Sequence, residues 1–132
     1  MIRFNKPYLS GNEHQYITQA VRRGRLSGNA EFTKKCHAFF EERYDFRKVF
    51  LTTSCTDALE MSAVLMHIQP GDEVILPSYA FVSTANAFVL HGAKAIFVDS
   101  NAENPNMNAA MIEPLINEKT KAIVTLHYAG FA

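Results

Sequence analysis

The chain has 132 residues, 48% of them hydrophobic, which is enough apolar material for one compact domain with a core. Its 13 basic and 13 acidic residues balance, which argues against binding to a nucleic acid or an anionic membrane through bulk charge. No leader segment is evident, and no apolar run approaches the roughly 18 residues of a membrane span. Cys36 and Cys55 are too far apart for a CxxC motif, which favours a reduced, cytoplasmic protein without a metal centre.

Two helices are predicted in the first third of the chain. Ser10 and Glu13 have the spacing of a capping box, and the apolar residues after them recur on one helical face, which predicts a helix over about 11–23. A second apolar stripe at helical spacing begins at Phe32 and predicts a helix that ends near Tyr44.

From residue 48 onward, short apolar runs alternate with helical segments, as in consecutive βα units. The predicted strands are KVFLTT at 48–53, EVILP at 73–77, KAIFVD at 94–99 and KAIVTL at 121–126. Helices are expected over about 56–67, from Ser78 to Gly92, and from near Glu113, because Pro114 is tolerated only in a first turn. Strands this apolar predict a parallel sheet covered on both faces.

The last predicted strand has no helix after it, although a buried strand needs packing on both faces. This pattern favours an incomplete α/β domain. The expected organisation is a helical arm over about 1–47 and a partial α/β domain over about 48–132.

Candidate ligand residues follow the strands, because parallel α/β sheets bind ligands beyond the carboxyl ends of their strands. The segment TTSCTDALE, from Thr52, places small hydroxyl residues at a helix N-terminus, where backbone N–H groups bind phosphate. The same residue types also serve as ordinary helix caps. Neither GxxxxGK[ST] nor GxGxxG is present, so a nucleotide-triphosphate or Rossmann dinucleotide site has no support.

Aromatic and imidazole side chains follow two other predicted strands. Tyr79 and Phe81 suit stacking on a flat heteroaromatic ring, and the alternative for Phe81 is a place in the core. His127 suits either proton transfer or a structural hydrogen bond.

Five linked motifs carry a resemblance over the whole chain. They are FNKPYLSGNE, RRGRLSGNAEFTKKC, LTTSCTDALEM, PGDEVILPSYAFVSTANAFVLHGAKAIFVD and TKAIVTLHYAG. In this order they resemble the DegT/DnrJ/EryC1/StrS family of sugar aminotransferases. The resemblance implies the N-terminal part of a fold type I, aspartate-aminotransferase-like large domain, with pyridoxal 5'-phosphate (PLP, or its amine form PMP) as cofactor in a homodimer. It also implies glutamate as amino donor and the nucleotide sugar dTDP-4-keto-6-deoxyglucose as acceptor.

The same resemblance assigns roles to particular residues. It implies that Ser54, Cys55 and Thr56 bind the cofactor phosphate and that Phe81 stacks on the pyridine ring. The residues that it places near the sugar nucleotide are Asn5, Lys6, Ser27 and Gly28. The Schiff-base lysine and the carboxylate on the pyridine nitrogen lie beyond residue 132 in this family. The isolated chain is therefore predicted to be inactive.

Two alternatives remain open. The first is a sugar dehydratase of the same family, which uses the same cofactor but carries histidine in place of the lysine. The second is a non-catalytic phosphate-sugar binding module.

Overall fold

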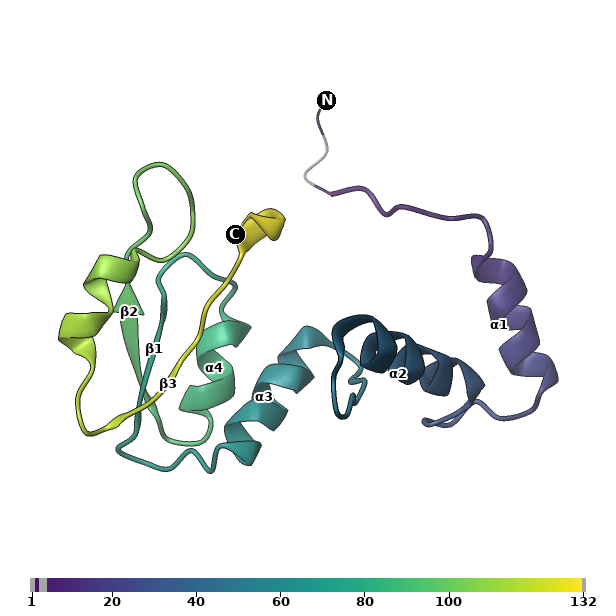
Figure 1. Cartoon of the computed structure of the whole chain (residues 1–132), viewed down its shortest axis with the longest axis horizontal. Coiled ribbons are helices and arrows are strands. Elements are labelled where there is room, and N and C mark those ends of the chain that lie inside the picture. Colours follow the sequence, from purple (N-terminus) through teal and green to yellow (C-terminus); the bar gives the residue numbers. More distant parts are fainter. Residues whose placement is uncertain (1, 3–4, 132) are drawn as a thin grey trace. The chain divides into compact units, whose positions relative to one another are not determined.

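A computed structural model describes residues 2 and 5–131 of the chain. These residues form two compact units that divide between Leu51 and Thr52 (Figure 1). The first unit contains helices α1 (Glu13–Arg22) and α2 (Glu31–Tyr44), and the second contains a three-stranded sheet with its helices. Among the described residues, no helix is both long enough and apolar enough to cross a membrane.

Helix α1 confirms the first predicted helix, but its start differs from the prediction. Its N-cap is Asn12, whose side chain makes no capping bond. The Glu13 carboxylate accepts hydrogen bonds from the Ser10 N–H at 2.6 Å and from the Ser10 hydroxyl at 2.9 Å. Because the helix begins at Glu13, this carboxylate binds the preceding turn instead of completing a box around a Ser10 cap.

Helix α2 confirms the second predicted helix and ends where Asp45 adopts a left-handed φ of 54°. Glu31 forms ion pairs with Arg23 and with Lys35, the latter at 2.8 Å between Nζ and Oε1. Near the other end of α2, Tyr44 stacks on Phe40 and on Phe46. Neither α1 nor α2 has a buried residue, so surface contacts alone hold these helices within the unit.

The strand predicted at 48–53 is wrong: these residues form no strand and pair with no strand in the described part of the chain. Their polar groups bond locally, since the Val49 N–H donates to Glu41 Oε1 at 3.3 Å and the Thr52 hydroxyl donates to the Ser54 carbonyl at 2.7 Å. Phe50 is 72% exposed. An apolar run becomes a strand only where another backbone pairs with it.

The second unit is built on a parallel sheet with strand order β2-β1-β3, made of β1 (Glu73–Pro77), β2 (Lys94–Val98) and β3 (Thr120–Ile123). The other three predicted strands and their parallel arrangement are confirmed, although β3 begins one residue earlier and ends three residues sooner than predicted. Between β1 and β3 the register shifts: Glu73 lies opposite Thr120, and Val74 lies opposite Ala122.

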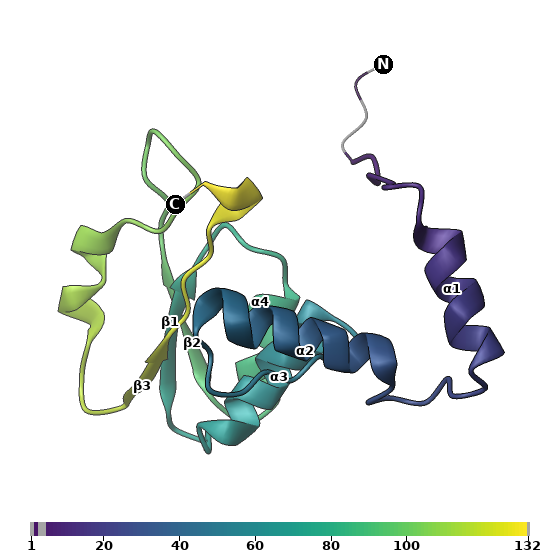
Figure 2. The same ribbon diagram turned by 45° about the vertical axis from the view of Figure 1, so that its right-hand side comes forward.

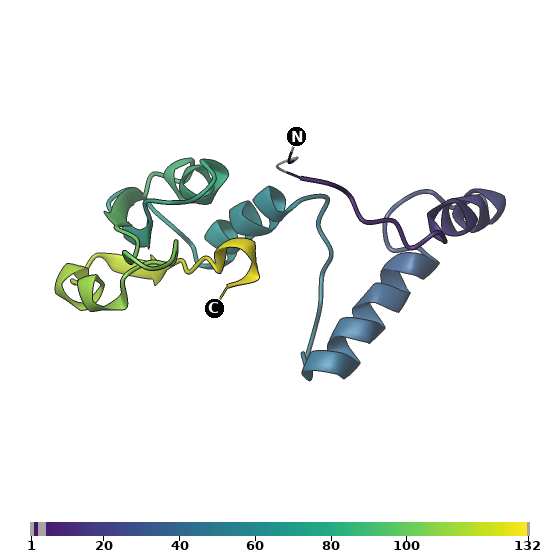
Figure 3. The same cartoon turned by 90° about the horizontal axis from the view of Figure 1, so that it is seen from above.

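Helices α3 (Cys55–Leu65) and α4 (Ser83–Val89) pack on one face of this sheet. The buried cluster there contains Ala63, Val74, Leu76, Ala87 and Phe88, each at most 2% exposed. Alternation along a strand directs Ile75 to the other face, where it is fully buried. The segment that carries η1 (Ala109–Met111) and η2 (Glu113–Leu115) lies on that other side of the strands (Figures 2 and 3).

Two predicted helices take different forms. The helix expected from Ser78 begins instead at Ser83, because the Ser78 hydroxyl donates to Asp99 Oδ1 at 3.0 Å and its N–H donates to the Val98 carbonyl at 2.8 Å. The helix expected near Glu113 is a 3-10 turn, η2, with Pro114 at its start. Its hydrogen bonds span three residues, from the Leu115 N–H to the Ile112 carbonyl and from the Ile116 N–H to the Glu113 carbonyl.

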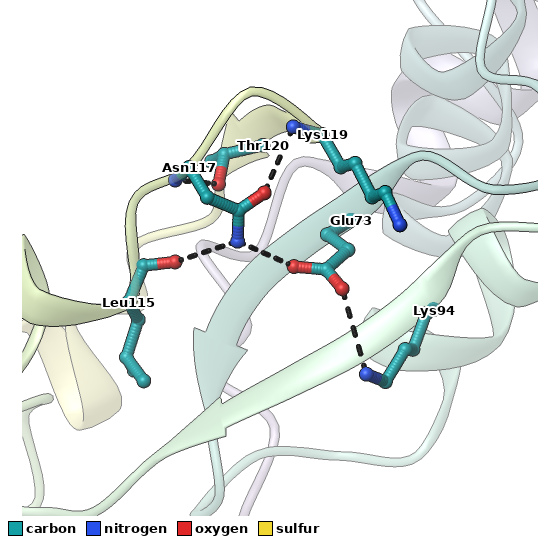
Figure 4. Close-up of polar contacts among 6 residues, drawn as sticks. All are labelled: Glu73, Lys94, Leu115, Asn117, Lys119 and Thr120. Atoms are coloured by element: carbon teal, nitrogen blue, oxygen red, sulfur yellow. Dashed lines mark hydrogen bonds and ion pairs between the residues drawn. The ribbon is translucent and has the colours of Figure 1, made fainter.

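A polar network ties the amino ends of the three strands (Figure 4). The Asn117 amide donates to Glu73 Oε2 at 2.9 Å, and Lys94 Nζ donates to Glu73 Oε1 at 3.4 Å. Asn117 Oδ1 in turn accepts the Lys119 N–H at 2.8 Å. The Asn117 hydrogen bond, supported by Lys94, lowers the pKa of Glu73.

Candidate functional site

The carboxyl ends of β1 and β3 meet the start of α3 around a cavity of about 380 Å³ in the second unit. Its walls come from the α3 N-terminus, from the loop and helix after β1, and from the chain after β3. The lining residues are Cys55, Thr56, Leu59, Phe81, Ser83, Thr84, Leu126, His127, Tyr128 and Ala129. A cavity of this size is within the range of small-molecule sites, which starts at about 300 Å³. The strand-end rule therefore locates the main candidate site.

Ser54 caps helix α3 and leaves donors free at its first turn. Its hydroxyl accepts the Asp57 N–H at 3.1 Å, and its carbonyl accepts the Ala58 N–H at 3.2 Å. The N–H groups of Cys55 and Thr56 have no intrahelical acceptor, as is usual for the first residues of a helix. Both residues line the cavity, so this end of α3 offers two backbone donors and the positive end of the helix dipole.

Asp57 adds a negative charge to the same turn. The Thr53 hydroxyl donates a hydrogen bond to its carboxylate. This bond, followed by hydrogen bonding from Ser54, lowers the pKa of Asp57 from its ordinary value of 3.8, at which the carboxyl group is already ionised near neutral pH. The Asp57 carboxylate repels an anion bound at the α3 N-terminus. The hydrogen-bond donors there must therefore attract the anion more strongly than this one carboxylate repels it.

Phe81 is not a core residue, because 74% of its surface is exposed. It lines the same cavity as Cys55 and Thr56. Three of the four residues predicted to bind a cofactor thus line one cavity, and the fourth, Ser54, caps the helix that borders it. An aromatic face beside a donor-bearing helix end suits a ligand with a flat ring and an anionic group.

The four predicted substrate residues lie in the first unit and are exposed. Asn5 and Lys6 belong to the segment before α1, and Ser27 and Gly28 belong to the loop between α1 and α2. Their contact with substrate remains a prediction.

Two residues of the chain after β3 join the cavity. His127, which the sequence leaves between two roles, lines it with an exposed side chain. Tyr128 lies at the end of the last predicted strand, but the sequence assigned it no role; its ring centroid lies 4.8 Å from that of Tyr79. Within residues 2 and 5–131, no group of three or more His, Cys, Asp or Glu side chains can hold a metal ion.

A family model described as the DegT/DnrJ/EryC1/StrS aminotransferase family matches residues 7–132. The chain belongs to this family. GDP-perosamine synthase from Caulobacter vibrioides is 33% identical over 124 residues, which cover 94% of the chain and 33% of that enzyme. UDP-4-amino-4-deoxy-L-arabinose–oxoglutarate aminotransferase from Shewanella sediminis is 49% identical over 78 residues, which cover 59% of the chain and 20% of that enzyme.

Solved aminotransferases share the fold of this DegT/DnrJ/EryC1/StrS member. The aminotransferase TlmJ from Streptoalloteichus hindustanus superposes with a TM-score of 0.88 and 35% identity, over 97% of the chain and 35% of that structure. NtdA from Bacillus subtilis, solved with bound PMP, superposes with a TM-score of 0.81 and 28% identity, over 89% of the chain and 27% of that structure. The expected fold type I architecture is confirmed, and the chain spans about a third or less of the length of these relatives.

Proposed function

We propose that this chain supplies the phosphate-binding part of a PLP-dependent aminotransferase that aminates a keto group of a nucleotide sugar. The observation that carries the proposal is the cavity between α3 and Phe81, which combines free N–H donors, a hydroxyl and an exposed aromatic face. Family membership and the PMP-bound relative support the cofactor.

The α3 N-terminus is the proposed phosphate site. The Cys55 and Thr56 N–H groups and the Thr56 hydroxyl would donate to the phosphate oxygens, while Ser54 keeps the first turn in place through its bond to the Asp57 N–H. Phe81 would stack on the pyridine ring and exclude water from one side of it. When bound, PLP supplies the electron sink that stabilises negative charge at the reacting carbon of the amino donor.

The proposed reaction transfers an amino group from glutamate to dTDP-4-keto-6-deoxyglucose and gives dTDP-4-amino-4,6-dideoxygalactose. Asn5, Lys6, Ser27 and Gly28 are the proposed contacts to the sugar nucleotide, and a homodimer is the proposed assembly. Amination is favoured over dehydration because the family model and the Shewanella relative are both named for aminotransferases.

Equilibrium dialysis of the 132-residue chain against PLP tests the cofactor site. We expect Phe81→Ala to weaken PLP binding about three- to tenfold, the usual range for loss of one stacking contact. Phe50→Ala is a matched control, because Phe50 is 72% exposed and lies in the other unit. Pyridoxal, which lacks the phosphate, should bind more weakly than PLP. Equal losses from both Phe variants, or equal binding of pyridoxal and PLP, would contradict the proposed site.

Catalytic turnover by the chain alone is not expected. None of the described residues that line the cavity is a lysine. The cavity therefore offers no side-chain amine to the aldehyde of the cofactor. The measurement is 2-oxoglutarate formed from glutamate in the presence of PLP and dTDP-4-keto-6-deoxyglucose, with a protein-free mixture as control. A rate above that control would show that the chain contains a sufficient catalytic group.

A further inference from the structure

A second, smaller cavity of about 240 Å³ lies beside the cofactor cavity. It is lined by Ser78, Tyr79, Ala80, Phe81 and Tyr128. Phe81 and Tyr128 line both cavities, so the two cavities adjoin at these two residues. A ligand in the smaller cavity would therefore lie directly next to a ligand in the larger one.

Two tyrosines from neighbouring strand ends shape the smaller cavity. Tyr79 follows β1 and Tyr128 follows β3, and these two strands pair in the sheet. Their rings are tilted by 47° with centroids 4.8 Å apart, so they do not stack face to face. Tyr79 is 51% exposed, which is high for an aromatic residue at the edge of a buried sheet. The pair leaves aromatic surface open instead of closing on itself.

Polar groups border this aromatic surface. The Ser78 hydroxyl lines the cavity and donates to Asp99 Oδ1 at 3.0 Å, which places a carboxylate behind it. The Tyr128 hydroxyl, whose ordinary pKa is 10.0, is neutral near pH 7, and hydrogen bonding with the Tyr79 side chain raises this pKa further. Neutral hydroxyl groups both donate and accept hydrogen bonds.

We propose that Tyr79 and Tyr128 form a binding surface for the pyranose ring of the nucleotide-sugar acceptor. A pyranose has an apolar face of C–H groups and an edge of hydroxyl groups, and the cavity offers matching aromatic faces with hydroxyl groups at their border. This inference rests on the proposed function, because amino transfer requires the keto carbon of the sugar to lie next to the cofactor cavity.

The nucleotide base is the competing occupant, since it too can stack on tyrosine. A base in this cavity would occupy the place next to the cofactor and keep the sugar away from it. Adjacency across Phe81 and Tyr128 therefore favours the sugar.

Nuclear magnetic resonance of the 132-residue chain with ring-labelled tyrosine tests the surface. The probes are dTDP-glucose, which carries a pyranose, and dTDP, which does not. We expect dTDP-glucose to shift the ring signals of Tyr79 and Tyr128, and dTDP to leave them in place. Equal shifts with dTDP would assign the cavity to the nucleotide part and overturn the proposal, as would unshifted signals with both probes.

Variants sharpen the same test. Tyr79→Ala should weaken dTDP-glucose binding about three- to tenfold, whereas Tyr79→Phe keeps the ring and should stay within about twofold. Tyr16→Ala is the matched control, because Tyr16 is 50% exposed and lies in the first unit. An unchanged affinity in Tyr79→Ala would overturn the proposal.

Dialysis with PLP separates this inference from the proposed function. Tyr79→Ala keeps Phe81 and the α3 N-terminus and should bind PLP as the unchanged chain does. Failure of the unchanged chain to bind PLP would count against the cofactor site, whatever the tyrosine signals show. Parallel loss of PLP and dTDP-glucose in Tyr79→Ala would indicate collapse of the loop and overturn the specific role of the ring.

Discussion

In the second unit, Val74, Leu76 and Ala87 are at most 1% exposed, whereas neither helix of the first unit has a buried residue. The second unit has a core between its sheet and α3 with α4, and that core fixes the strand ends around the cavity. The first unit depends on ion pairs and exposed aromatic contacts. The cavity at the start of α3 therefore belongs to the better packed of the two units.

The largest expected difference is between two leucines. Leu76→Ala removes a side chain that is 1% exposed and should lower the unfolding free energy by about 2–5 kcal/mol. Leu26→Ala, at a position 73% exposed in the first unit, should change it by less than about 0.5 kcal/mol. Denaturant unfolding followed by circular dichroism measures both. If both variants lost a similar amount of unfolding free energy, Leu26 in the first unit would contribute as much to stability as the buried Leu76.

Two glycines with positive φ provide a second comparison. Gly92 has φ of 90°, and an added Cβ would lie 2.8 Å from Pro70 Cγ and 3.0 Å from Pro70 Cα. Gly92→Ala should therefore cost about 1–3 kcal/mol through backbone strain and the contact with Pro70. Gly24 has φ of 67° and open space, so Gly24→Ala in the first unit should cost only about 1 kcal/mol. Thermal unfolding would show which variant loses more, and the reverse order would contradict the packing around Pro70.

The smallest effect concerns pH. The pKa of Glu73 lies below its ordinary value of 4.5 because Asn117 and Lys94 favour the carboxylate. This stabilisation is present above that ordinary value and is lost as the pH falls through the lower pKa of the folded state. Asn117→Ala should flatten the fall in stability of the second unit between neutral and acidic pH, measured by denaturant unfolding at several pH values.

Glu13 is the control for this pH effect. Its pKa is also lowered, by its own backbone N–H and by Ser10, but it lies in the first unit. Glu13→Gln should leave the pH dependence of the second unit unchanged. A change as large as that of Asn117→Ala would contradict the assignment to Glu73.

Sequence patterns predicted the sheet better than its surroundings. EVILP became a central strand whose apolar residues are buried on both faces, as the continuous run indicates, whereas KAIFVD became an edge strand that leaves Phe97 57% exposed. The run at 48–53 is also largely apolar but has no pairing partner among the described residues, and pairing is a property of the whole fold. Ser78 has the chemistry of a cap, but a partner 21 residues away, Asp99, binds its hydroxyl instead.

The candidate site was predicted in the same uneven way. The strand-end rule identified Phe81, and the hydroxyl residues at a helix N-terminus identified the α3 start, although the strand predicted before it does not form. The contact between Tyr128 and Tyr79 could not be predicted, because it depends on how β3 pairs with β1. Its position directly after the last strand was visible, but no local pattern reveals which side of the sheet it faces.

The register shift between Glu73 and Val74 decides that question. Without it, Val74 would lie opposite Lys121, but the shift places Ala122 there. Exposure then alternates along the following residues, and Ala122, Val124, Leu126 and Tyr128 fall on the half-buried side. The extra residue in β3 therefore determines which side chains between Ala122 and Tyr128 lie on the half-buried side. Inserting one residue between Ile123 and Val124 would reverse that alternation and turn Tyr128 away from the position that it shares with Tyr79 and Phe81.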